Sequence, residues 1–266
     1  MDFQRPRTVD EALDALAERP TATVLAGGTD LMVEVNLAHR RPEAVVAIRR
    51  VEGLDEWEGR RIGAGVSYRR MERGPLRALA ELARTVGSPQ IRSAGTLGGN
   101  LGTASPAGDA LPFLAALDAG IEVASRAGGT RRIPYADFHT GVKRTSLQPG
   151  EMILGAVLPE HVPERQAFAK IGTRNAMVIS TVSACLFRDE DGTTRIALGA
   201  VGPTMIRPRR AEEMISAEPR PSETARSEFA RLVADEVQPI TDHRSTEDYR
   251  RHASGVLARR LLERVL

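Results

Sequence analysis

The 266-residue chain has a single cysteine, Cys185, so no disulfide can form within it. For the same reason it cannot supply the thiolates of an iron–sulfur cluster or a zinc site of its own. Cys185 lies in the apolar run VSACLF, which is typical of a small buried side chain. Aromatic residues account for only 4% of the sequence, which argues against a surface that stacks nucleic-acid bases.

A strong net charge and long apolar runs are also missing. The net charge is only +2, so the chain is not expected to bind nucleic acid. No apolar stretch approaches the length needed to cross a bilayer, and the N-terminus MDFQRPRTVDEAL lacks the apolar core of a signal peptide. A cytoplasmic protein without a membrane span is therefore expected.

The common catalytic and nucleotide-binding motifs are absent as well. The sequence has no GxGxxG after a predicted strand, no GxxxxGKS or GxxxxGKT, no HExxH and no GxSxG. Its five histidines show no metal-ligand spacing, so no metal site is predicted. The sequence therefore lacks the main motif of a nicotinamide-binding Rossmann unit and that of a nucleoside triphosphatase.

Hydrophobic periodicity predicts mixed helices and strands in the first part of the chain. Thr8 and Glu11 form a capping box that opens a helix. Further helices are predicted over residues 71–86 and 109–119, the second with Asp109 near its cap. Strands are predicted over residues 21–26, 44–50, 60–68, 121–125 and 131–138.

The pattern changes after a boundary near residues 159–166. Residues 180–202 contain two apolar strands around an Asp191-Gly192 turn, which predicts a hairpin. Two helices follow, one over residues 222–237 and one that starts at Ser245 and continues to the end of the chain.

Two glycine-rich segments carry almost no charge, one at the end of the strand predicted over residues 21–26 and one after the helix predicted over residues 71–86. They are VLAGGTDL at residues 24–31 and SAGTLGGNLGTASPAGDALPFL at residues 93–114. Glycine lets the backbone approach a ligand closely, and successive N–H groups can line a site for an anion. Two such loops that face each other could hold a diphosphate, with short side-chain donors beside them. An ordinary turn after a strand is the alternative for each segment.

These segments also carry a family resemblance. AGGTDL at 26–31 and GTLGGN at 95–100 resemble the two FAD loops of the molybdenum hydroxylase family. More narrowly, the chain resembles the separate flavoprotein (medium) subunit of carbon monoxide dehydrogenase and related xanthine-dehydrogenase-type enzymes. Further matches in order make the resemblance cover nearly the whole chain; they fall at residues 138–159, 167–174, 199–212 and 240–262.

The resemblance implies an α+β (α/β) fold. A two-lobed FAD-binding domain of the vanillyl-alcohol-oxidase/PCMH-like type is expected over residues 1–160, with lobes of about 1–52 and 53–160. A C-terminal flavoprotein domain with a three-stranded antiparallel sheet and helices is expected over residues 165–266.

The resemblance further implies FAD as cofactor and assigns its contacts. The backbone of residues 26–30 and 96–100 would hold the diphosphate, Thr103 and Asp109 would touch the phosphate and ribose end, and Ile153 and Lys170 would lie near the flavin ring. For Lys170, an ordinary lysine at a strand edge is the alternative. No catalytic side chain is expected, because the flavin carries the chemistry. The predicted cofactor-binding residues are Ala26, Gly27, Gly28, Thr29, Asp30, Thr96, Gly98, Gly99, Asn100, Thr103, Asp109, Ile153 and Lys170.

The function implied is that of an electron-transfer subunit in a heterotrimer that dimerises. A large molybdopterin-binding subunit would oxidise the substrate, a small subunit with two [2Fe–2S] clusters would relay the electrons, and this chain would pass them to an external acceptor. Two alternatives remain open: a free-standing FAD-dependent oxidoreductase on the same fold, and a non-catalytic nucleotide-binding scaffold. Val178 stands where many family members have an aspartate near the flavin, which leaves the acceptor open.

Overall fold

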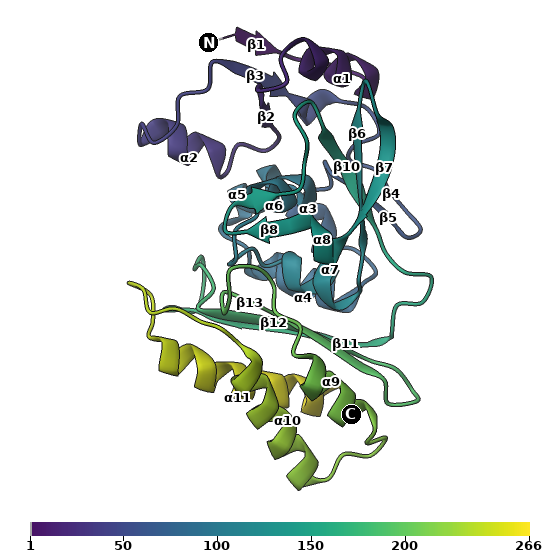
Figure 1. The fold of residues 1–266 in the computed structure, drawn as a ribbon, viewed down its shortest axis with the longest axis vertical. Helices are drawn as coiled ribbons and strands as arrows, with labels where there is room; N and C mark the ends of the chain where they lie inside the picture. The colour runs from purple at the N-terminus through teal and green to yellow at the C-terminus, as the bar shows by residue number, and fades with distance from the viewer. Residues whose placement is uncertain (1) are drawn as a thin grey trace.

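A computed structural model describes residues 2–266. Figure 1 shows a small N-terminal sheet at one end, a five-stranded sheet beside a group of short helices in the middle, and a three-stranded sheet backed by helices at the other end. This mixture of helices and sheets confirms the predicted fold class, including the three-stranded antiparallel sheet near the C-terminus.

The N-terminal sheet is parallel and has the strand order β1-β3-β2. Its first connection is the predicted capped helix, α1, in which the Thr8 hydroxyl accepts a hydrogen bond from the Glu11 amide at 3.1 Å. The elements of this part are β1 (Asp2–Gln4), α1 (Val9–Glu18), β2 (Thr23–Leu25), α2 (Leu31–Asn36), β3 (Ala44–Ala47) and a 3₁₀ turn (Ile48–Arg50). The first glycine-rich segment leaves β2 and enters α2, a helix that the sequence pattern did not predict.

The five-stranded sheet is antiparallel and has the order β4-β5-β10-β6-β7. The segment that follows β10 leads into the C-terminal part of the chain. Its strands are β4 (Trp57–Glu58), β5 (Arg61–Gly63), β6 (Gly120–Ser125), β7 (Gly129–Pro134) and β10 (Met152–Val157). A separate two-stranded ribbon joins β8 (His139–Gly141) and β9 (Arg144–Thr145).

Short helices lie between the five-stranded sheet and the C-terminal part of the chain. Of these, α6 and α8 contact the five-stranded sheet, whereas α4 and α7 contact strands of the C-terminal sheet. The helices are α3 (Tyr68–Met71), α4 (Arg77–Thr85), α5 (Pro89–Ala94), α6 (Leu97–Thr103), α7 (Leu111–Ala116) and α8 (Tyr135–Phe138). The helix predicted over residues 71–86 is confirmed as α4, but it begins later than predicted, because Gly74-Pro75 separates α3 from α4. Proline has no N–H to continue a helix, and a Cβ on Gly74 would lie 2.5 Å from the Trp57 ring.

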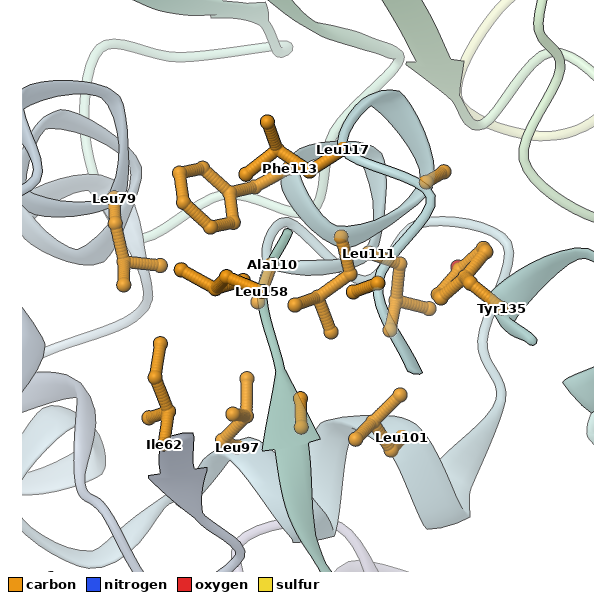
Figure 2. Close-up of a cluster of buried hydrophobic side chains, with 14 of the residues drawn as sticks. Ile62, Leu79, Leu97, Leu101, Ala110, Leu111, Phe113, Leu117, Tyr135 and Leu158 are labelled. Atoms are coloured by element: carbon orange, nitrogen blue, oxygen red, sulfur yellow. The ribbon is translucent and has the colours of Figure 1, made fainter. Parts of the chain in front are cut away.

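The second glycine-rich segment is a helix rather than the predicted loop. The Thr96 hydroxyl caps α6 by accepting a hydrogen bond from the Gly99 amide at 3.0 Å. Leu97 and Leu101 lie one turn apart on the same face, and both are fully buried in the central core. Figure 2 shows these two side chains pointing toward Leu111 and its neighbours. Packing of the two leucines therefore overcomes the poor helix propensity of the glycines, and the glycines fall on the other faces of α6.

The C-terminal part is a three-stranded antiparallel sheet, β11-β12-β13, with helices on one face (Figure 1). Its elements are β11 (Arg165–Ile171), β12 (Val182–Arg188), β13 (Thr194–Gly199), α9 (Arg209–Ser216), α10 (Glu223–Glu236) and α11 (Glu247–Val265). The hairpin is confirmed, with Gly192 at φ +95° in its turn. The last helix is capped by Thr246, one residue after the predicted Ser245.

Successive residues of β12 alternate between two cores, as the two-residue period of a strand requires. Cys185 and Phe187 join the central core, whereas Ala184 and Leu186 join the core beneath α9–α11. Cys185 is fully buried, as predicted, and burial raises the pKa of its thiol well above the ordinary value. Within residues 2–266, no helix combines the length and the apolar character that a bilayer crossing requires.

Candidate functional site

A cavity of about 750 Å³ lies where the two glycine-rich segments meet. Its size falls in the range of about 300–1,000 Å³ that is usual for small-molecule sites. Residues 22–31 and most of residues 95–109 line the larger part of it, and the other lining residues include Glu34, Arg40, Lys143 and residues 151–153 and 177–179. Every predicted cofactor-binding residue except Lys170 lines this cavity.

The first segment presents free backbone donors. No hydrogen bond within residues 2–266 uses the N–H groups of residues 27–31. Gly28 has φ +72°, a conformation that favours glycine, and this curvature of the chain is of the kind that lets successive amides surround an anion. Gly27 lies so close to the end of α5 that a Cβ there would stand 1.8 Å from the Ala94 carbonyl oxygen. The loop is therefore pressed against the second segment with its amides unpartnered.

Most backbone donors of the second segment have partners within the protein. The Gly98 amide donates to the Ala64 carbonyl at 2.8 Å, the Gly99 amide to the Thr96 hydroxyl at 3.0 Å, and the Asn100 amide to the Thr96 carbonyl at 3.0 Å. These three donors are used inside the protein, and the contact of residues 96–100 with a diphosphate stays a prediction. What α6 offers instead is a surface without side chains at Gly99 and Gly102.

One polar atom at the cavity wall lacks a partner. The Asn100 side-chain oxygen is buried and has no hydrogen bond within the described residues. A buried polar atom of this kind costs free energy unless a ligand or water satisfies it. Close to it, the Thr103 hydroxyl donates to the Asp30 carboxylate at 3.4 Å and so connects the two segments.

The cations at the cavity are already engaged. Lys143 donates to Glu34 at 2.5 Å, and Arg40 lies 3.9 Å from the same carboxylate. The hydrogen bond from Lys143 lowers the pKa of Glu34, and Glu34 in turn raises the pKa of Lys143. Since the Glu34 carboxylate engages both Lys143 and Arg40, a diphosphate would accept hydrogen bonds mainly from the free amides of residues 27–31.

A buried ion pair closes the end of the cavity that faces the C-terminal sheet. The Lys170 ammonium donates to Asp109 at 2.7 Å, and the Ser180 hydroxyl donates to the other oxygen of Asp109 at 2.5 Å. Only 8% of either charged side chain is exposed. Burial raises the pKa of Asp109, against the opposing effects of Lys170 and Ser180. Asp109 lies next to Ala110, the N-cap of α7, as predicted.

This contact brings together two residues for which the resemblance implies different roles. The contact of Asp109 with the phosphate and ribose end of the cofactor, and that of Lys170 with the flavin ring, stay predictions. Lys170 also donates to the carbonyls of Thr85 at 2.9 Å and Val178 at 3.1 Å, which uses all three of its N–H groups.

Comparison with known protein families identifies both parts of the chain. Residues 1–161 match the FAD binding domain in molybdopterin dehydrogenase, and residues 167–265 match the CO dehydrogenase flavoprotein C-terminal domain. The chain belongs to the FAD-binding subunits of the molybdenum hydroxylase family. It is accordingly a subunit of the carbon monoxide dehydrogenase and xanthine dehydrogenase type, an FAD-dependent oxidoreductase subunit.

Relatives of this flavoprotein subunit match over nearly their full length. The nicotinate dehydrogenase FAD-subunit of Eubacterium barkeri is 30% identical, and the match covers 100% of this chain and 96% of the relative. A putative xanthine dehydrogenase FAD-binding subunit of Escherichia coli is 29% identical over 98% of this chain and 94% of its own length. Among solved structures, carbon monoxide dehydrogenase from Hydrogenophaga pseudoflava superposes with a TM-score of 0.91 at 27% identity, covering 100% and 96% of the two chains.

The cavity of this flavoprotein subunit fits the FAD of its family. The unpartnered amides of residues 27–31, the bare face of α6 and the unsatisfied Asn100 oxygen are features that a bound dinucleotide would satisfy. Sequence reasoning assigned no role to Glu34, Lys143 or Ser180, because each lies outside the glycine motifs. Glu34 and Lys143 line the cavity, and Ser180 donates to the lining residue Asp109. Lys143 falls within the family match at residues 138–159, but no local pattern singled out its side chain.

Proposed function

We propose that this chain is the electron-transfer subunit of a heteromeric molybdenum hydroxylase. It would take electrons from the [2Fe–2S] clusters of a small partner subunit and pass them to an external acceptor. The observation that carries the proposal is the set of unpartnered amides at residues 27–31 beside the bare face of α6. Bound FAD would supply the redox chemistry, and the chain supplies binding and orientation.

The roles of the chain's own groups follow from their hydrogen bonds. The amides of residues 27–31 would meet the diphosphate, since they are the donors that the protein leaves free. The Asn100 oxygen would accept a hydrogen bond from a ligand N–H or O–H group. Gly99 and Gly102 would let the ligand lie close to α6, because no side chain stands in the way.

The flavin ring would lie toward the C-terminal sheet. Lys170 resembles a position near the ring in this family, and Asp109 lies against Lys170, so both mark the same end of the cavity. Met177 and Ile179 line the cavity and are each 55% exposed. We place the acceptor's approach here, where the cavity meets the surface.

The partners and the domain division belong to the same proposal. The relatives in Eubacterium barkeri and Escherichia coli are named as FAD subunits, which supports a complex of several chains. A large molybdopterin-binding subunit and a small iron–sulfur subunit would complete a heterotrimer that dimerises. Residues 1–160, in lobes of about 1–52 and 53–160, would carry the cofactor, and residues 165–266 would close its flavin end.

Isolation of the tagged chain from its own host tests this proposal. The expected result is a complex that contains FAD, two [2Fe–2S] clusters and molybdopterin, identified by absorption spectroscopy, metal analysis and mass spectrometry of the subunits. A chain that is isolated alone, holds FAD and oxidises a substrate would be a free-standing oxidoreductase. A chain that holds no flavin and cannot be reconstituted with FAD would leave only the scaffold alternative.

A further inference from the structure

A second cavity, of about 600 Å³, lies apart from the candidate cofactor site and shares no lining residue with it. Its walls come from the turn between β4 and β5, from α3 with its cap, and from the Gly74-Pro75 break before α4. Three of the lining residues are arginines, Arg69, Arg70 and Arg73, and none of the lining residues carries a carboxylate. The size is in the range that is usual for small-molecule sites, and the charge favours an anion.

Helix α3 separates the two cavities. Tyr68 lines the candidate cofactor site, whereas its chain neighbours Ser67 and Arg69 line the second cavity. The Tyr68 amide donates to the Gly95 carbonyl at 3.1 Å, which fixes this part of the chain against the segment that enters α6. A molecule in the second cavity would therefore occupy different space from the cofactor.

The three arginines leave an excess of positive charge at the second cavity. Arg69 donates to Glu72 at 3.0 Å, but a fourth arginine, outside the lining, shares that carboxylate at 3.4 Å. Arg70 donates to the carbonyl of Asp55, a group without net charge. Arg73 has no hydrogen-bond or ion-pair partner for its guanidinium within residues 2–266. A ligand with several negative charges would supply the missing acceptors.

An aromatic surface lies beside these cations. Trp57 is the chain's one tryptophan, and its half-buried ring packs against the central core while it lines the second cavity. The ring lies close against Gly74, where a Cβ would stand 2.5 Å from it. The Ser67 hydroxyl accepts a hydrogen bond from the Arg70 amide at 3.2 Å and keeps its own O–H to donate. A flat ligand ring can stack on an indole in such a place.

We propose that the second cavity is a nucleotide site, which binds a nucleoside polyphosphate through Arg69, Arg70 and Arg73 and its base through Trp57. A chain of phosphates matches three guanidinium groups, whereas one carboxylate would need only one of them. The indole ring provides for the base what the arginines provide for the phosphates. This site is additional to the FAD cavity and does not depend on the function proposed above.

Titration of the flavin-loaded chain with ATP, in buffer without divalent cations, tests the proposal. FAD keeps ATP out of the first cavity, and the one indole N–H signal in a ¹⁵N NMR spectrum reports on Trp57. ATP should shift that signal and bind about tenfold or more tightly than adenosine or inorganic triphosphate, since each of these lacks half of the contacts. An indole signal that ATP leaves unmoved, or inorganic triphosphate bound as tightly as ATP, would overturn the proposal.

Two arginine variants locate the binding energy. Arg73→Met should weaken ATP binding by roughly fivefold or more and leave the melting temperature unchanged, because no partner within the protein is lost. Arg77→Met is the matched control, since Arg77 is 61% exposed on the neighbouring helix and does not line the cavity. It should keep ATP affinity within about twofold. Equal weakening in the two variants, or unchanged ATP affinity in Arg73→Met, would show that the nucleotide does not bind here.

Discussion

Alanine substitutions on the bare face of α6 should make the flavin-free protein more stable while they weaken FAD binding. Gly99 and Gly102 both line the cavity. A Cβ on Gly102 would meet the Ile153 side chain at 3.7 Å, an ordinary contact, and a Cβ on Gly99 would meet only the Thr96 hydroxyl, at 3.1 Å. The fold therefore has room for a methyl group at Gly102, whereas a methyl group at Gly99 requires the Thr96 hydroxyl to shift by a few tenths of an ångström.

The size of the effect follows from helix propensity. Replacing a glycine by alanine within a helix gains about 0.5–1 kcal/mol, and 1 kcal/mol shifts the melting temperature of a protein of this size by about 2–4 °C. Gly102→Ala should show this gain most cleanly, because its methyl group meets no close neighbour. FAD affinity should fall by about tenfold, or 1.4 kcal/mol, since the same methyl group occupies space that the ligand needs.

Thermal unfolding of flavin-free protein and fluorescence titration with FAD would measure the two effects on the same samples. Gly98→Ala is the instructive contrast, because its Cβ would lie 2.6 Å from that of Ala64 and 2.9 Å from the Ala64 carbonyl. That variant should lose about 1–3 kcal/mol of stability through overpacking, so a loss of FAD there would say little about the cavity. If Gly99→Ala and Gly102→Ala gain stability and bind FAD as tightly as the parent chain, the cofactor does not lie against α6.

Three further predictions concern stability. Burial opposes ionisation of Asp242, but the Arg244 amide and the Arg250 guanidinium lower its pKa to about 2, below the ordinary 3.8. The ionised Asp242 carboxylate stabilises the fold fully above pH 3.8, and this stabilisation is lost as the pH falls toward 2. In an acid titration of the free energy of unfolding, Asp242→Asn should therefore show a smaller decline between pH 3.8 and 2 than the parent chain. Burial lowers the pKa of His139 from 6.5, although the hydrogen bond to the Leu101 carbonyl acts in the opposite direction. The stability of the protein should therefore fall as the pH drops below 6.5, and thermal unfolding should show a smaller fall in His139→Gln. Arg188 is fully buried, donates to the Gly192 carbonyl in the hairpin turn and to the Glu218 carbonyl just after α9, and has no carboxylate partner within residues 2–266. Arg188→Met should therefore cost at least about 2 kcal/mol in urea unfolding.

Local sequence signals predicted those parts of the fold whose cause is local. The Thr8 cap of α1 and the Asp191-Gly192 turn each depend on residues within a few positions, and both are confirmed. The motif resemblance likewise led to the segments that line the cavity, because close backbone approach leaves a visible run of glycines.

What the sequence could not predict depends on partners distant in the chain. The glycine-rich segment was interpreted as a loop because glycine disfavours helices, yet Leu97 and Leu101 hold it as α6 once the central core forms. Lys170 and Asp109 are 61 residues apart, so nothing in either neighbourhood showed that they pair. For the same reason, the use of the Gly98 amide by Ala64 was invisible before the strands were placed.

Hydrogen–deuterium exchange with and without FAD tests the central claim most directly. The claim is that the unpartnered amides of residues 27–31 hold the dinucleotide, while the amides of 98–100 are already bonded within the protein. FAD should slow exchange strongly in a peptide that covers residues 24–33 and change it far less in one that covers 97–101. Unchanged exchange at residues 24–33 in flavin-loaded protein would contradict this account of how the cofactor is held.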